Sequence, residues 1–180
     1  MTRTMPRLRG LLAAAALAAC AACGFASTPT RHDALVAIAV LEKSVSSPEA
    51  VDAARTIVTY AQASDDVMVD IGPDQIPWSE EKWGLGDGRE LACQSMMLAS
   101  FIAGNVRSQI KNNRAEDDTY SGWVFAINTY NRLRAKERFR SPSLESLSKM
   151  ESDGTLLQHA REVEARSSQQ EEPQEQKPLA

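Results

Sequence analysis

The chain has 180 residues, a length that predicts a single domain with tails. Hydrophobic residues make up 43% and charged residues 24%, which excludes a fully disordered chain, a collagen-like chain and a multi-span membrane protein. The formal net charge of −4 argues against nucleic acid as a main partner, and three cysteines are too few for a disulfide scaffold.

The chain begins with the pattern of an export signal. Arg3, Arg7 and Arg9 make the start positive, and the stretch from Gly10 to Ala19 that follows carries no charge. This apolar stretch has about half of the ~20 residues that a transmembrane helix needs. Its length is typical of the apolar region of a secretory signal.

Leu17-Ala18-Ala19-Cys20 closes the apolar stretch with one aliphatic residue, two small residues and a cysteine. This order resembles the lipobox of bacterial lipoprotein precursors. The resemblance implies that residues 1–19 are removed as a signal peptide and that the sulfur of Cys20 receives a diacylglyceryl group. It also implies that the new amino group is often acylated with a fatty acid such as palmitate. More than one acyl chain is needed for a stable membrane anchor.

Two alternatives remain open at this end of the chain. Cys23 is a rival lipid-bearing position, and an ordinary cleaved signal ending near Ala26 would leave a soluble periplasmic protein. In the lipoprotein interpretation Ala21, rather than an aspartate, follows the modified cysteine. The resemblance then implies the periplasmic face of the outer membrane if the host is Gram-negative, with residues 20–30 as a tether.

Residues 31–166 carry the spacing of a helical domain. Thr30 and Asp33 have the arrangement of a capping box, and Ser47-Pro48 has the pattern of a second helix start. The apolar residues that we expect on the core side of these two helices are Leu35, Ile38, Leu41, Val51, Ala54, Val58 and Ala61.

Residues 66–88 interrupt the helical spacing and predict one long irregular loop. Val67, Val69 and Ile71 alternate with more polar positions, which is compatible with a short extended piece. Gly72-Pro73 and Ile76-Pro77 then require turns or extended backbone. A connection this long in a compact domain is usually functional.

The second half of the chain predicts four further helices and a tail. The longest runs from about Arg89 to Lys111, with an apolar stripe and with small residues that allow another helix to approach closely. The stripe consists of Leu91, Leu98, Ile102, Val106 and Ile110, and the small residues are Ala99, Ser100, Ala103 and Gly104. Further starts follow Asp117 or Asp118, Ser141 and Thr155. Residues 167–180 contain too little apolar surface to fold and predict a disordered tail. The expected fold is therefore all-α, with about six helices in antiparallel hairpins.

The sequence contains no pattern specific for a cofactor, a metal or a catalytic residue. The glycines at positions 84, 86 and 88 lack the third glycine and the preceding strand of a dinucleotide fingerprint. Cys93 lies in an apolar helix and is interpreted as a buried side chain. One enzymatic alternative remains, a hydrolase acting on cell wall or lipid that uses Glu80 or Glu81 as the acid beside Trp78 and Trp83.

Charge and apolar residues single out two segments as interaction surfaces. Residues 65–90 are rich in acids, whereas residues 130–140 hold five bases and one acid, Glu137. Either segment could steer a charged partner, or both could be ordinary solvated surface. The acidic segment also carries Ile76, Trp78, Trp83 and Leu85, residue types found at interface hot spots. The alternative is that the two tryptophans fold back as a lid over the helical core.

The sequence thus predicts a lipid-anchored protein of a bacterial envelope that binds another protein and is not an enzyme. The candidate contact is formed by Ile76, Trp78, Trp83 and Leu85. An immunity or inhibitor protein and a structural spacer are further alternatives.

Overall fold

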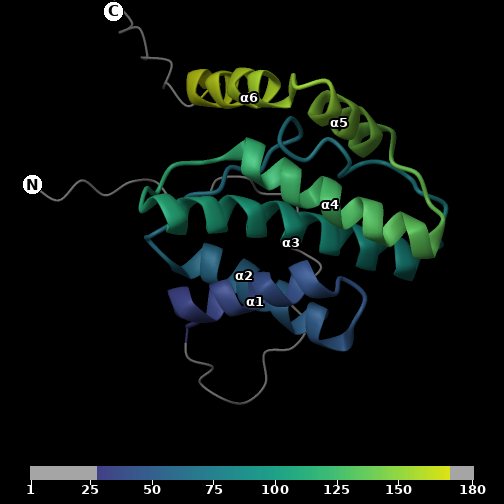
Figure 1. Cartoon of the computed structure of the whole chain (residues 1–180), viewed down its shortest axis with the longest axis horizontal. Coiled ribbons are helices and arrows are strands. Elements are labelled where there is room, and N and C mark those ends of the chain that lie inside the picture. The colour runs from purple at the N-terminus through teal and green to yellow at the C-terminus, as the bar shows by residue number, and fades with distance from the viewer. Residues whose placement is uncertain (1–27, 171–180) are drawn as a thin grey trace, which may run out of the picture.

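The computed structural model describes residues 28–170, and within this range the protein is all-α, as expected (Figure 1). No strand occurs in these residues. The helices are α1 (Arg31–Lys43), α2 (Pro48–Ala63), α3 (Asp87–Asn112), α4 (Thr119–Glu137), α5 (Pro142–Ser152) and α6 (Leu156–Gln170). The expected signal peptide, Cys20, Cys23 and most of the tether lie outside the described residues, as do residues 171–180 of the expected tail.

Side-chain caps begin α1, α4 and α5 where the sequence predicts them, whereas Ser47 before α2 makes no side-chain cap bond. Thr30 and Asp33 form the reciprocal bonds of a capping box at α1. Asp118 caps α4, and the Ser141 side chain accepts the Leu144 backbone N–H at the start of α5. These caps satisfy backbone donors that have no partner inside the helix.

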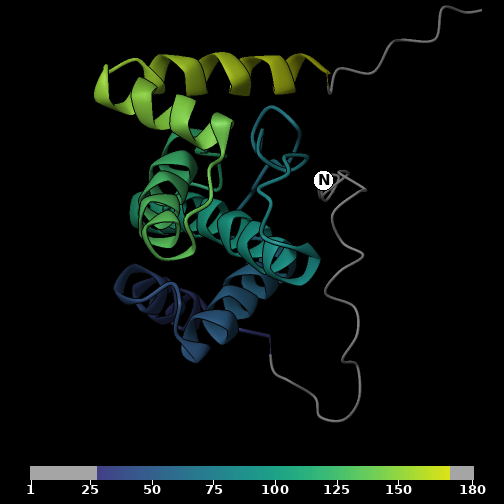
Figure 2. The ribbon, with the colours of Figure 1, turned by 90° about the vertical axis from the view of Figure 1, so that its right-hand side faces the viewer.

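The helices form three stacked layers, made of α1 with α2, α3 with α4, and α5 with α6 (Figures 1 and 2). The middle layer is antiparallel, because Arg89 at the start of α3 pairs with Glu137 at the end of α4, while Ser108 bonds Asp118 at the other end. The stripe of small residues lies at this crossing. A Cβ at Gly104 would lie 2.2 Å from the carbonyl oxygen of Ser121. The prediction of close helix approach is therefore confirmed.

Three large residues that were expected on the core side are exposed instead. Leu35 is 38%, Val51 55% and Leu91 51% exposed. Ile38 and Leu41 are buried as expected, and the rest of the core face of α1 and α2 is made of Ala34, Ala37, Ala50, Ala53, Ile57 and Tyr60. Half of this inner face is alanine, which allows the two helices to pack closely while Leu35 and Val51 point outward.

The connection between α2 and α3, residues 64–86, is irregular and lies beside α3 and α4, next to α6 (Figure 2). Val67 and Val69 are buried while Met68 is exposed, so the expected alternation is present. The backbone of Met68 pairs with the side-chain amide of Gln109 rather than with a strand. That amide oxygen accepts the Met68 N–H at 2.9 Å, and the amide nitrogen donates to the Met68 carbonyl.

Helix α6 continues to Gln170 and so extends past position 166, where the sequence predicted the tail to begin. The added turn is held to the irregular connection, because Gln75 donates to the Ser167 hydroxyl and Arg166 pairs with Asp74 at 3.3 Å. None of the helices between residues 28 and 170 is both long and apolar enough to cross a membrane.

Candidate functional site

The apolar residues of the expected partner contact lie inside the protein. Ile76 is 7%, Trp78 1% and Trp83 7% exposed, and Leu85 is half-buried against the core. Trp78 packs edge-on against Phe101, with ring centroids 6.3 Å apart. The segment is thus the lid over the helical core that the alternative interpretation described, because a single chain has to bury this large aromatic surface. In this arrangement the two indole rings are buried and are not exposed for contact with a partner.

Glu81 is a structural cap for α5. Its carboxylate accepts hydrogen bonds from the Trp83 indole N–H at 3.0 Å, from the Ser143 backbone N–H at 2.8 Å and from the Ser141 hydroxyl. Burial acts to raise the pKa of Glu81, but the bonds from Ser141, Ser143 and Trp83 together outweigh it and hold this pKa below its ordinary value. A general acid needs the opposite shift, so the geometry does not support the hydrolase hypothesis at Glu81.

Replacing Glu81 with glutamine is expected to lower the free energy of unfolding by about 1 kcal/mol at pH 7, because the charge-assisted bonds are lost. A carboxyl with a lowered folded-state pKa contributes stability above its unfolded value of 4.5 and loses it as the pH falls toward the folded value. The difference between wild type and variant in urea unfolding should therefore shrink below about pH 4.5. The neighbouring exposed Glu80→Gln is the control and should change stability little. A pH-independent loss for Glu81→Gln would contradict the assignment.

A buried polar cluster joins the irregular connection to α3 and α4. The Asp117 carboxylate accepts from the Asp70 backbone N–H at 2.9 Å, from the Asn105 amide at 2.6 Å and from the Thr119 hydroxyl at 2.7 Å. Burial is the largest influence and raises the pKa of Asp117, with a further contribution from the charge of Asp118, although the three donors favour the charged form. The cluster orients the segments around it and is directed inward.

Sequence reasoning did not identify this cluster. The available signal was the pair Asn105 and Gln109, which are one turn apart on the otherwise apolar stripe of α3. Both side chains are buried, and they bond each other. Buried amides need partners, so their position predicts a polar contact across the core.

Glu164 of α6 lies beside this cluster and accepts the Thr119 backbone N–H at 2.9 Å. Burial is the main cause that raises the pKa of Glu164, and the charges of Asp117 and Asp118 raise it further. A raised folded-state pKa means that stability is lost as the pH rises from about 4.5 through that value. Glu164→Gln keeps an acceptor for Thr119 and should raise stability by about 0.5 kcal/mol at pH 7.

The test of this gain is the unfolding midpoint in urea at pH 7 and at pH 4. The advantage of Glu164→Gln should vanish at pH 4, where wild-type Glu164 is itself neutral. Glu162→Gln, at an exposed position on the same helix, should show no gain at either pH. A gain that persists at pH 4 would mean that charge repulsion is not the cause.

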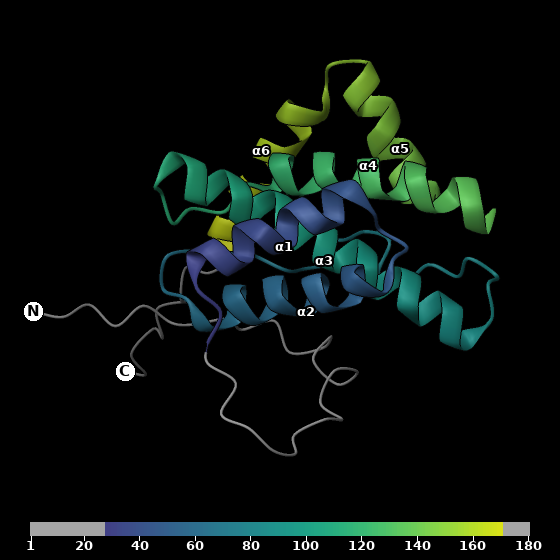
Figure 3. The same ribbon diagram turned by 60° about the horizontal axis from the view of Figure 1, so that its bottom comes forward.

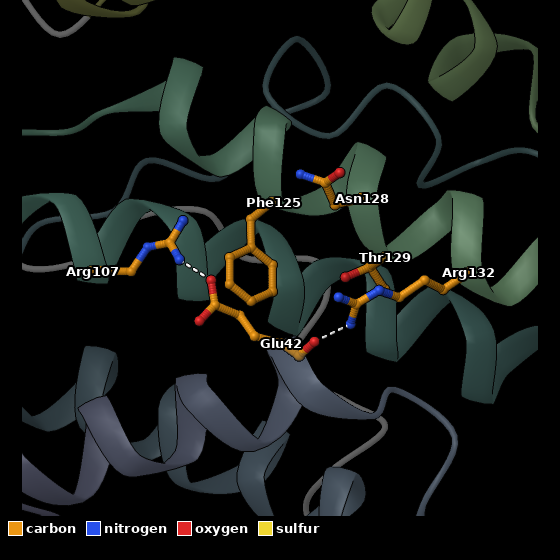
Figure 4. Close-up of a pocket in the computed structure, with 6 residues that line it drawn as sticks. All are labelled: Glu42, Arg107, Phe125, Asn128, Thr129 and Arg132. Carbon is orange, nitrogen blue, oxygen red and sulfur yellow. Dashed lines mark hydrogen bonds and ion pairs between the residues drawn. The ribbon is translucent and has the colours of Figure 1, made fainter.

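A shallow hollow of about 110 Å³ lies where the end of α1 meets α3 and α4 (Figure 4). Arg107 pairs with the Glu42 carboxylate and lies 5.1 Å from the centre of the Phe125 ring. Arg132 donates to the main-chain carbonyls of Leu41, at 3.3 Å, and of Glu42. A guanidinium at a helix C-terminus satisfies carbonyls that lack partners. The hollow is too small for most ligands and its arginines hold α1 in place.

The beginning of α1 is held in a related way. Arg31 donates to the Ile110 carbonyl at the end of α3, beside a second hollow of about 230 Å³ that Asp65 and Asp66 also line. Each end of α1 is thus fixed by one guanidinium that contacts a helix C-terminus, Arg31 at the start and Arg132 at the finish.

The last turn of α4 and the residues that follow it carry four exposed bases, Arg134, Lys136, Arg138 and Arg140, which we call the basic ridge. Arg134 and Arg140 share Glu145, at 3.4 and 3.1 Å, and the Arg140 side chain is still 83% exposed. Lys136 and Arg138 are exposed and have no ion-pair partner among residues 28–170. In the acidic segment, Asp74 pairs with Arg166 and Glu81 bonds the start of α5, so these two carboxylates are engaged away from the ridge.

Other reactive groups show no arrangement for chemistry. Cys93 is half-buried, and burial first, with the nearby Glu137 charge, raises the pKa of its thiol, which disfavours the nucleophilic thiolate. Among residues 28–170, no three His, Cys, Asp or Glu side chains are grouped so that they could hold a metal ion.

Comparison of the chain with protein-family models, curated protein sequences and solved structures finds no match.

Proposed function

We propose that this protein is a lipid-anchored module of a bacterial envelope that binds an acidic protein partner through the basic ridge. The observation that carries the proposal is the exposed pair Lys136 and Arg138, which has no ion-pair partner within residues 28–170. The order Leu17-Ala18-Ala19-Cys20 supports the anchor, and Ala21 supports the outer membrane in a Gram-negative host.

The backbone at Arg138 supports a role beyond ordinary surface charge. Arg138 ends α4 in the left-handed region, with φ of 55°, a conformation that costs a non-glycine residue about 1 kcal/mol. Glycine would be the easier residue at this position. An arginine nevertheless stands where the chain turns, and its side chain is exposed. Strain of this kind at an exposed charged residue favours a contact function.

Charge complementarity identifies the class of partner. The chain carries 24 acidic against 20 basic residues, so the four exposed bases between Arg134 and Arg140 differ in sign from the net charge of the chain. Such a patch raises the rate of encounter with an acidic surface, and this effect weakens with added salt.

The ridge and Arg31, the first residue of α1, lie at opposite ends of the middle layer. Arg31, where α1 begins, contacts Ile110 near the end of α3, whereas Glu137 beside the ridge contacts Arg89 at the start of α3. The 26 residues of α3 span about 39 Å at 1.5 Å per residue. A partner on the ridge would therefore approach the end of the domain that is remote from Arg31, where the helical domain begins.

The binding test reverses charge on the ridge. Lys136→Glu with Arg138→Glu should reduce retention of an envelope partner at least tenfold, and wild-type retention should fall with rising salt. The matched control is Lys111→Glu with Arg161→Glu, which changes the net charge equally at exposed positions elsewhere. Equal loss in both double variants would contradict a role for the ridge, as would no loss in either.

The anchor is tested by Cys20→Ser, which should move the protein from the membrane fraction to the soluble fraction. Mass spectrometry of the wild-type protein should show a chain that begins at an acylated Cys20. A native chain that begins at an unmodified Met1 would overturn the envelope proposal.

A further inference from the structure

The outward face of α1 has an unusual composition for a surface helix. Its core side is formed by Ala34, Ala37, Ile38 and Leu41. On the opposite side Leu35 is 38% and Val36 51% exposed, and Ala39 is also exposed. A surface helix normally shows polar residues there, so α1 is apolar on both sides in its middle turns.

The basic residue types on this face stand only at its ends. His32 and Lys43 are both exposed and bracket the apolar turns. The two acids of α1 are engaged by other groups, since Asp33 is part of the capping box and Glu42 pairs with Arg107. The face therefore offers apolar surface with a basic residue at its far end and no free carboxylate, a composition suited to a layer of anionic lipid headgroups.

The position of α1 in the molecule fits the same partner. Helices α1 and α2 form one outer layer, and Figure 3 shows both of them in front of α3 and α4 with no other helix over them. Helix α6 belongs to the layer on the other side (Figure 1). The eleven residue steps from Cys20 to Arg31 can reach at most about 40 Å, so a lipid on Cys20 would hold Arg31, the first residue of α1, within that distance of the bilayer.

We infer that the outward face of α1, centred on Leu35 and Val36, lies on the lipid surface to which the protein is anchored. The inference rests on the proposed lipid anchor at Cys20 and adds an orientation, with the α1 and α2 layer against the membrane and α6 away from it. One acyl anchor and one apolar helix face then act together, as two membrane signals joined by a short linker.

The test uses the lipidated protein in vesicles of phosphatidylcholine and phosphatidylglycerol. In a Cys23→Ser and Cys93→Ala background, a fluorophore is attached to Val36→Cys or to Leu157→Cys. Leu157 is the matched control, because it is 44% exposed on α6, in the layer opposite α1. A nitroxide-labelled lipid should quench the probe at position 36 at least twofold and should leave the probe at 157 nearly unchanged. Adding Leu35→Glu to the first variant should reduce this quenching.

The outcomes separate the inference from the proposal on which it rests. The intact mass first shows whether Cys20 is acylated, and an unacylated chain removes the anchor itself. With an acylated chain, equal quenching at the two positions would overturn the orientation and leave the anchor standing. A probe at position 36 that is shielded from water but not quenched by the labelled lipid would place a protein, or a second copy of this chain, on the face and would likewise overturn the inference.

Discussion

Gly104→Ala is expected to lower the free energy of unfolding by about 3 kcal/mol, measured by urea unfolding followed by circular dichroism. Alanine favours a helix over glycine by about 1 kcal/mol, so an isolated helix would gain from this change. Here the added Cβ would lie 2.2 Å from the Ser121 carbonyl oxygen and 2.8 Å from the Phe125 Cβ. Because the nearest obstacle is backbone, α3 and α4 have to move apart along their whole contact.

The control for this change is Gly88→Ala in the first turns of the same helix. A Cβ there would have no neighbour within 4 Å, so stability should stay level or rise by a few tenths of a kcal/mol. If both alanine variants behaved alike, the close crossing of α3 and α4 would be wrong.

Trp78→Ala is expected to remove about 3–5 kcal/mol, a large part of the stability of a domain of this size. Trp78 is 1% exposed and packs on Phe101 of α3. Its removal leaves a cavity between the irregular connection and the middle layer. The expected readout is a lower unfolding midpoint with early loss of the near-ultraviolet aromatic signal.

Leu91→Ala is the matched control, because Leu91 is 51% exposed and truncating its side chain should change stability by no more than about 0.5 kcal/mol. A Trp78→Ala protein as stable as wild type but unable to retain a partner would restore the docking role that the sequence suggested for this ring.

The helices were predictable because their starts carry local chemistry. Thr30 with Asp33 and Ser141 with Pro142 are signals that act within one turn and need no tertiary information. The buried faces of α1 and α2 were harder to predict. Apolar residues occur on several sides of each helix, so more than one choice of buried face fits the helical spacing. Hydrophobicity alone assigns Leu35 and Val51 to the core, whereas in the packed hairpin alanines lie on the core side and these two residues are exposed.

The candidate site divides in the same way. The bases of residues 130–140 were visible in the sequence, but the left-handed turn at Arg138 and the sharing of Glu145 depend on the fold. Trp78 and Trp83 fit a lid and an interface equally well in sequence, since both uses require a large apolar ring. Glu81 caps a helix that begins 60 residues later in the chain, so its role depends on the fold that brings α5 beside it.

The guanidinium of Arg31 determines where mechanical tension would enter the domain. A pull on the chain before residue 31 arrives at Arg31, the first residue of α1, which is bonded to Ile110 at the end of the central helix. Tension would pass through this bond into α3 as well as along the α1–α2 hairpin. The hairpin would be peeled away only after this single link had given way, and the link from Arg132 to the far end of α1 would then be the next point of resistance.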